Sequence, residues 1–119
     1  MPKDDNLIQK KSYAFAIRMV KLFQHLSKKK NEWILSKQLL RCGTAIGANV
    51  EESIGGQSRA DFVAKMSIAY KEARETLFWL RLLHDTSYLS PKEFQSLFAD
   101  ADELCRILSS ILTTTKKNT

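Results

Sequence analysis

Apolar residues recur at spacings of three and four residues in four separate segments of the chain. This spacing places their side chains on one face of an α-helix, and it predicts helices over about residues 6–30, 32–54, 59–85 and 91–113. Because short connections join these long helices, the expected fold is all-α, an antiparallel up-down-up-down four-helix bundle. The predicted core positions are Ile8, Ser12, Phe15, Met19, Leu22, Leu26, Leu35, Leu39, Cys42, Ile46, Val50, Phe62, Met66, Ala69, Ala73, Thr76, Leu80, Leu83, Phe94, Leu97, Ala101, Leu104, Leu108 and Ile111.

Local signals mark several helix ends. Ser58 and Asp61 resemble a capping box, and Ser90 with Glu93 forms a complete one, with a proline at the first helical position. The pair Gly55-Gly56 predicts a left-handed residue at the end of the second helix. The whole chain, residues 1–119, is expected to form a single domain with an ordered core over about residues 6–113 and a frayed tail.

Gly43 and Gly47 stand four residues apart, so they share one face of the second predicted helix. A glycine inside a helix costs about 1 kcal/mol relative to alanine. Two missing side chains on one face allow another backbone to approach closely, which would compensate for that cost. The sequence therefore predicts a close helix contact here, either within the bundle or between subunits. The alternative is that the glycines kink or fray the helix.

The formal net charge of +6 is unevenly distributed, because residues 6–30 include seven basic residues and no acidic one. Several of them recur at helical spacing on one flank of the first predicted helix. We call this set the basic stripe: Lys11, Arg18, Lys21, His25 and Lys28. Such a stripe suits the phosphate backbone of RNA or DNA, although a solvated bundle surface is the alternative. No aromatic residues interleave with it, so base-specific readout is not expected. The candidate nucleic-acid-binding residues are Lys11, Arg18, Lys21 and Lys28.

Residues typical of metal and catalytic sites are scattered along the chain. The sequence has no Glu-x-x-His pair of the kind that carboxylate-bridged metal centres in helical bundles use. Cys42 and Cys105 are far apart, and no serine or cysteine lies in a nucleophile elbow or beside a histidine. We therefore expect no enzyme activity, no bound metal and no cofactor.

The sequence also bears on membranes and compartment. The longest apolar run, Tyr13 to Ile17, is far shorter than the roughly 20 residues of a membrane helix. The apolar face of the first helix is needed within the bundle, so binding to a membrane surface is not expected. The opening residues lack the apolar stretch of a secretory signal, and a reduced cytoplasmic protein is expected.

Two stretches of the sequence, QLLRCGTAIGANVEES and SRADFVAKMSIAYKEARETLFWLRLL, carry a resemblance to a known family. Over roughly residues 6–112 the chain resembles the four-helix-bundle family of bacterial 23S rRNA intervening-sequence proteins, encoded in segments inserted in large-subunit ribosomal RNA genes. The same family includes the accessory variability determinant proteins of diversity-generating retroelements. Cys42 stands where many relatives carry serine, and we assign it no chemistry. The matching residues are Gln38, Leu39, Leu40, Arg41, Gly43, Thr44, Ile46, Gly47, Asn49, Glu51, Glu52, Asp61, Phe62, Lys71, Glu72, Glu75, Thr76, Trp79 and Leu80.

The resemblance implies a homo-oligomer, specifically a homopentameric ring. The retroelement members of the family bind nucleic acid and a reverse transcriptase, so the resemblance makes nucleic acid an expected partner and leaves open whether a reverse transcriptase is one. The residues themselves add opposite charges on the second and third predicted helices, including Lys71 and Arg74, which could fix the register of a helix or subunit contact. An ordinary solvated charged face or a ligand site are the alternatives. The candidate oligomer or helix-contact residues are Arg41, Gly43, Gly47, Asn49, Glu52, Glu72 and Glu75.

Two functions remain open from the sequence. The first is a non-enzymatic oligomeric accessory protein that contacts the backbone of RNA or DNA through a basic face. The second is an oligomeric protein–protein interaction scaffold that does not bind nucleic acid.

Overall fold

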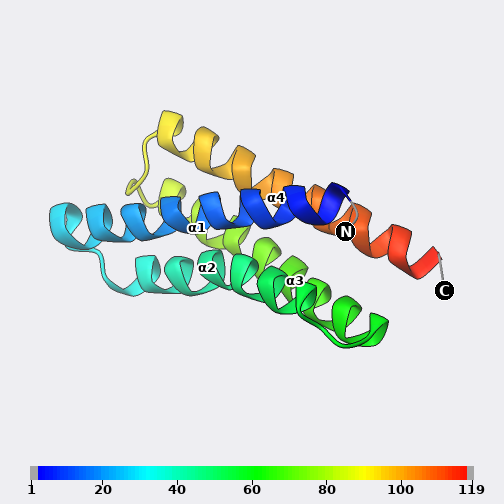
Figure 1. The fold of residues 1–119 in the computed structure, drawn as a ribbon. Helices are drawn as coiled ribbons and strands as arrows, with labels where there is room; N and C mark the ends of the chain where they lie inside the picture. The colour runs from blue at the N-terminus through cyan, green and yellow to red at the C-terminus, as the bar shows by residue number, and fades with distance from the viewer. Residues whose placement is uncertain (1–2, 118–119) are drawn as a thin grey trace.

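The computed structural model describes the backbone of residues 3–117 and the side chains of residues 7–117. It contains four α-helices, α1 (Lys3–Lys30), α2 (Ile34–Ile54), α3 (Arg59–Asp85) and α4 (Pro91–Lys117), and no strand within the described residues (Figure 1). The helices form an elongated bundle of 47 × 21 × 19 Å. The predicted all-α class is confirmed.

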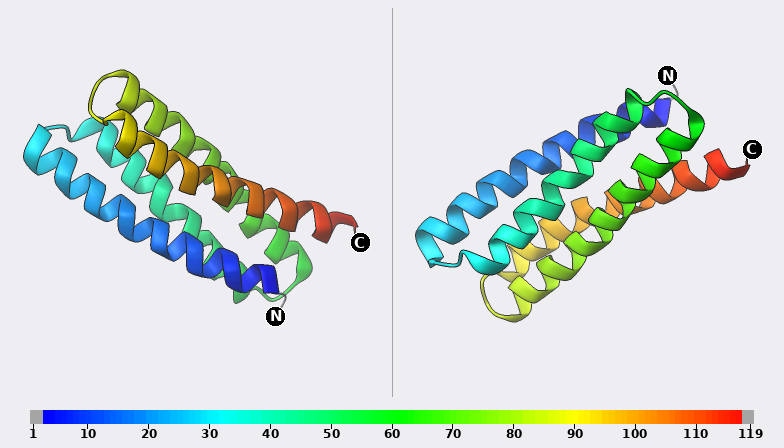
Figure 2. Two further views of the ribbon diagram at one scale, coloured as in Figure 1. Left: turned by 90° about the horizontal axis from the view of Figure 1, so that it is seen from above. Right: turned by 90° about the horizontal axis from the view of Figure 1, so that it is seen from below.

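Within the bundle each helix packs against two others: α1 and α3 both contact α2 and α4 (Figure 2). Gly43 of α2 faces Met19 of α1, whereas Gly47, one turn further along α2, faces the earlier residue Ser12. Between α1 and α4, Lys11 pairs with Glu103, and the later residue Arg18 pairs with the earlier residue Asp100. These two helices therefore also run in opposite directions. Neighbouring helices therefore run antiparallel, and the first turn of α1 and the last turn of α4 lie at the same end of the bundle.

The core consists almost entirely of the positions that the hydrophobic spacing predicts. All six predicted positions of α1 are buried, including the polar Ser12, which is 1% exposed. In the other three helices the exceptions are Leu35, Phe62 and Phe94, which are only partly buried. Each of these lies in the first turn of its helix. Periodicity therefore identifies the buried face but not where burial ends.

Three helix ends differ from the prediction, and the first of them is the start of α1, which lies at Lys3 instead of about residue 6. The second helix begins at Ile34 instead of Glu32, because Glu32 caps it with its carboxylate: the amides of Ile34, Leu35 and Ser36 donate to that group at 3.1, 3.1 and 2.6 Å. The last helix continues to Lys117, four residues beyond the predicted end. Predicted and observed bounds agree at Lys30, Ile54, Arg59, Asp85 and Pro91.

The prediction of a left-handed residue at Gly55-Gly56 is wrong. Gly55 has φ −84°, and no described glycine has positive φ. The left-handed residues are Asn31 and Ser87, with φ of 53° and 71°, in the other two connections. At Gly56 a Cβ atom would lie 3.1 Å from the carbonyl oxygen of Ser53, so this position favours glycine because of close packing and not because of its backbone angle.

Both predicted serine caps are present. The Ser58 hydroxyl accepts a hydrogen bond from the Asp61 amide at 3.1 Å. At the start of α4 the bonding is reciprocal, since the Glu93 amide donates to the Ser90 hydroxyl at 3.1 Å and the Ser90 amide donates to the Glu93 carboxylate at 2.9 Å. These bonds satisfy amides that a helix start leaves without a partner.

Candidate nucleic-acid interface and helix contacts

The basic stripe of α1 divides into two halves in the structure. In the first half, Lys11 Nζ lies 3.1 Å from Glu103 Oε1, and Arg18 Nη1 lies 2.6 Å from Asp100 Oδ2. Arg18 also donates to the Ser96 hydroxyl of α4 at 3.0 Å. Partly exposed ion pairs of this kind contribute about 0–1 kcal/mol to stability. Their main consequence here is that α4 balances the charges of Lys11 and Arg18.

In the second half of the stripe, no described acidic side chain balances the lysine charges. Lys21 and Lys28 are exposed and make no ion pair with any side chain that the structure describes. His25 is also exposed, and it lies with Lys21 in a shallow hollow between α1 and α4 that reaches Glu93 and Leu97.

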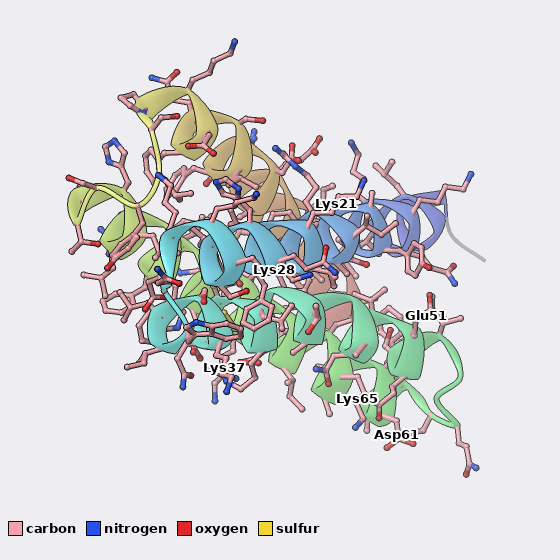
Figure 3. All side chains as sticks on the ribbon, turned by 90° about the vertical axis from the view of Figure 1, so that its left-hand side faces the viewer. Lys21, Lys28, Lys37, Glu51, Asp61 and Lys65 are labelled. Atoms are coloured by element: carbon pink, nitrogen blue, oxygen red, sulfur yellow. The ribbon has the colours of Figure 1, made fainter. Side chains whose placement is uncertain are left out.

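Other lysines extend this charge around the α1–α2 corner. We call five exposed lysines the basic end of the bundle: Lys21, Lys28, Lys29, Lys30 and Lys37. None of the five has an acidic partner within 4 Å among the side chains described. Figure 3 looks onto this end and labels Lys28 on α1 and Lys37 on α2, with Glu51 and Asp61 farther along the bundle.

The acidic residues near the basic end have other roles. Glu32 is the sole acid in residues 19–37, and it is 7% exposed and occupied by the three amides of α2. The Ser90 amide, which donates to Glu93, holds the pKa of that carboxyl below its usual value, and Lys30 and His25 act in the same direction. Asp85 lies 3.3 Å from His84. The local charge of the basic end is therefore positive.

The structure places Gly43 and Gly47 at a close contact within the bundle, between α2 and α1. A Cβ atom on Gly43 would lie 2.5 Å from Met19 Cγ, and one on Gly47 would lie 3.3 Å from the backbone oxygen of Ser12. Met19 and Ser12 are both 1% exposed. Of the two arrangements that the sequence left open, these positions support an intramolecular one.

Arg41 joins α2 to α3 through two carboxylates. Its guanidinium contacts Glu72 at 3.2 Å and also contacts Glu75. Glu75 in turn accepts a hydrogen bond from the indole N–H of Trp79 at 2.9 Å. The Glu72 side chain is 16% exposed, whereas those of Arg41 and Glu75 are 51% and 36% exposed, so only the Glu72 side of this group is largely shielded from solvent.

The remaining residues predicted for helix contacts have different partners. Glu52 pairs with Lys65 at 3.0 Å, across the same α2–α3 seam. Asn49 donates to the carbonyl oxygen of Ala45 in its own helix at 2.8 Å. Lys71 and Arg74 are exposed, and neither forms an ion pair with a described side chain. The structure thus brings Arg41, Glu72 and Glu75 together but leaves Asn49 outside that group.

The two cysteines are buried free thiols. Burial raises the pKa of Cys42 and of Cys105 to about 11, so both remain protonated at neutral pH. Among the described residues, no three His, Cys, Asp or Glu side chains are grouped as a metal ion would require. Within residues 3–117, none of the helices has the length and apolar character needed to cross a membrane.

The sequence matches a family model over almost its whole length. The model describes the 23S rRNA-intervening sequence proteins, and it matches residues 4–110. The chain belongs to this family. A search of curated proteins finds no match.

A solved structure supports the same assignment. It is the crystal structure of a protein of unknown function from the S23 ribosomal protein family of Bacteroides thetaiotaomicron. That protein is 44% identical to this chain, with a TM-score of 0.91, and the match covers 92% of this chain and 98% of the other. The bundle described above is therefore shared within the family.

Three features of this family member, besides the part of Lys37 in the basic end, are not predicted by the spacing of its sequence. Asp100 and Glu103 stand three residues apart beside the buried positions Leu97 and Leu104 of α4, and this was the available signal that they border a neighbouring helix. The pairing of Lys65 with Glu52 was also missed. The third feature is Trp33 at the basic end, which is half exposed.

Proposed function

We propose that this protein is a non-enzymatic, oligomeric accessory protein that binds the phosphate backbone of nucleic acid through its basic end. The observation that carries the proposal is the set of five exposed lysines with no acidic partner within 4 Å among the described side chains, around a corner where Glu32, the one acid of residues 19–37, is buried and caps a helix. Membership in a family described by its relation to 23S rRNA supports the same conclusion.

Backbone recognition follows from the chemistry of these side chains. Lysine ammonium groups attract phosphates as point charges and carry no pattern that distinguishes one base from another. A ring of five subunits, as the family resemblance implies, would carry a formal charge of +30, five times +6. We therefore expect binding to RNA and DNA of any sequence, strengthened by several copies of the basic end acting together.

The proposal predicts a specific effect of removing two lysines. Replacing Lys28 and Lys37 by glutamine should lower the salt dependence of duplex binding, because each lysine–phosphate contact contributes about 0.9 to the slope of log affinity against log salt. We expect a decrease of about 1.8 for each basic end that contacts the duplex, measured by fluorescence anisotropy of a labelled 20-base-pair duplex at a series of salt concentrations.

The matched control is the double replacement of Lys71 and Arg74 by glutamine, which removes the same charge from the exposed face of α3. This control should retain the parent slope. Equal decreases in both double variants would show that net charge alone matters, and no binding by the parent protein would refute the proposal.

A scaffold function is the second candidate, and an apolar row on α1 favours it. Tyr13, Ile17 and Val20 recur at spacings of four and three on the outer side of the helix, and they are 66%, 42% and 43% exposed. Such a row suits a protein partner, including another copy of this chain.

We expect Ile17→Asp to reduce the mass of the oligomer in multi-angle light scattering. Ala64→Asp, which introduces the same charge at an exposed position of α3, a helix that does not pack against α1, is the control. An unchanged mass for Ile17→Asp would exclude this row from the assembly.

A further inference from the structure

The corner between α1 and α2 presents an aromatic ring among the lysines of the basic end. Trp33 is 49% exposed and the adjacent Ile34 is 76% exposed. Lys28, Lys29 and Lys30 come just before this corner, and Lys37 lies one helical turn after Trp33. The hydrophobic pattern of the sequence gives Trp33 no core position, and the structure places it at the corner that joins the lysines of α1 to Lys37 of α2.

The indole is held in place by a well-ordered corner. Asn31 takes a left-handed conformation, and the Glu32 amide donates to the Leu26 carbonyl at 2.9 Å, which closes the turn. The buried Glu32 carboxylate then fixes the first amides of α2. Phe23 of α1 supports the indole of Trp33 edge-to-face, with ring centroids 6.0 Å apart. A ring supported in this way loses little freedom when a ligand stacks on it.

We propose that Trp33 stacks on an unpaired base of single-stranded nucleic acid while the lysines of the basic end hold the neighbouring phosphates. The inference rests on the proposed nucleic-acid binding and narrows its substrate class. A base exposes its aromatic face only when it is unpaired and unstacked, and aromatic side chains beside cations are the usual platform for such bases. In a duplex the bases stack on one another, so duplex binding gains only the phosphate contacts.

A lipid surface suits the corner less well. Membrane-surface binding uses the whole apolar face of an amphipathic helix. Here the core-facing apolar sides of α1 and α2 are buried in the bundle, and the exposed apolar row of α1 ends at Val20, well before the corner. The corner itself offers one half-exposed indole and one isoleucine. The charge of the basic end is matched instead by a phosphate at every nucleotide.

The test compares the binding of a labelled 20-nucleotide oligothymidylate with that of a labelled 20-base-pair duplex. Trp33→Ala should weaken single-strand binding about tenfold, within the range that one stacked base contributes, and leave duplex binding unchanged. Trp33→Phe, which keeps an aromatic face, should retain most of the single-strand affinity. Phe78→Ala is the matched control, because Phe78 is an exposed aromatic residue of α3 that belongs neither to the basic end nor to the apolar row of α1, and it should alter neither affinity.

Fluorescence supplies an independent measurement. In a Trp79→Phe background, where Trp33 is the sole indole, the oligothymidylate should quench the emission. If the parent binds both ligands but Trp33→Ala affects neither or both equally, the stacking inference is wrong while the proposed function stands. If the parent binds neither ligand, both fail. A blue shift with phosphatidylserine-containing vesicles, without quenching by the oligonucleotide, would overturn the inference in favour of a lipid surface.

Discussion

Replacing Gly47 by leucine should destabilise the bundle by about 3 kcal/mol, at the upper end of the cost of overpacking a closed contact. Even a Cβ atom at this position would lie 3.3 Å from the Ser12 backbone oxygen, and that oxygen cannot rotate away as a side chain can. The further atoms of leucine would have to separate α1 from α2. Urea unfolding monitored by circular dichroism measures the effect.

Two matched variants make the result specific. Gly47→Ala needs a shift of only a few tenths of an ångström, and its better helix propensity, worth about 1 kcal/mol, offsets that strain. Its stability should therefore lie within about 1 kcal/mol of the parent. Ala48→Leu places the same side chain one residue away at an exposed position and should change stability by less than about 0.5 kcal/mol. If Gly47→Leu unfolds at the same urea concentration as Ala48→Leu, the close contact between α1 and α2 is not the reason for the glycine.

The second glycine distinguishes backbone contact from side-chain contact. A Cβ atom on Gly43 would meet Met19 at 2.5 Å, closer than the contact at Gly47, but the atoms it meets belong to a flexible side chain. Met19 is buried, so it can move only by repacking the core around it. The two glycines thus serve one helix contact in different ways, and the spacing of four residues in the sequence indicates the shared face without revealing this difference.

Periodicity was sufficient to predict the fold because a bundle core depends on one repeated physical requirement. Every helix must bury a face, and positions such as Phe15, Ile46 and Leu104 satisfy it without reference to their partners. The antiparallel arrangement then follows from connections too short to allow any other path. The start of α2 was less predictable, because Glu32 caps this helix from a position just outside it.

The candidate site was predicted less completely, because charge on one helix was considered without the helix beside it. Lys11 and Arg18 belong to the basic stripe by spacing, yet Glu103 and Asp100 balance them across a sequence separation of more than 80 residues. In contrast, Lys37 joins the basic end from a different helix. Pairing between helices is a tertiary property, so a helical spacing rule applied to α1 alone includes the balanced charges and omits Lys37.

Replacing Glu32 by alanine should also destabilise the protein by about 3 kcal/mol. One carboxylate accepts three amide hydrogen bonds at the start of α2, and the shortest, from Ser36, is 2.6 Å. Ser36 is itself 1% exposed, so water cannot readily take the place of the lost oxygen, and an unsatisfied buried donor costs about 1–3 kcal/mol. This exceeds the usual cost of losing a helix cap, about 1 kcal/mol, because Glu32 serves several amides at once.

Local and global measurements together test the role of Glu32. Amide hydrogen exchange at residues 34–36 should accelerate in Glu32→Ala more than elsewhere in α2, and the urea midpoint should fall. Glu32→Gln, which keeps one acceptor oxygen of similar reach, should lose about half as much stability. Glu51→Ala removes an exposed carboxylate that accepts one hydrogen bond, from Gln9, and should cost less than about 0.5 kcal/mol. Equal stabilities for Glu32→Ala and Glu51→Ala would mean that the corner bearing Trp33 is held by the Asn31 turn and the Phe23 contact without the carboxylate.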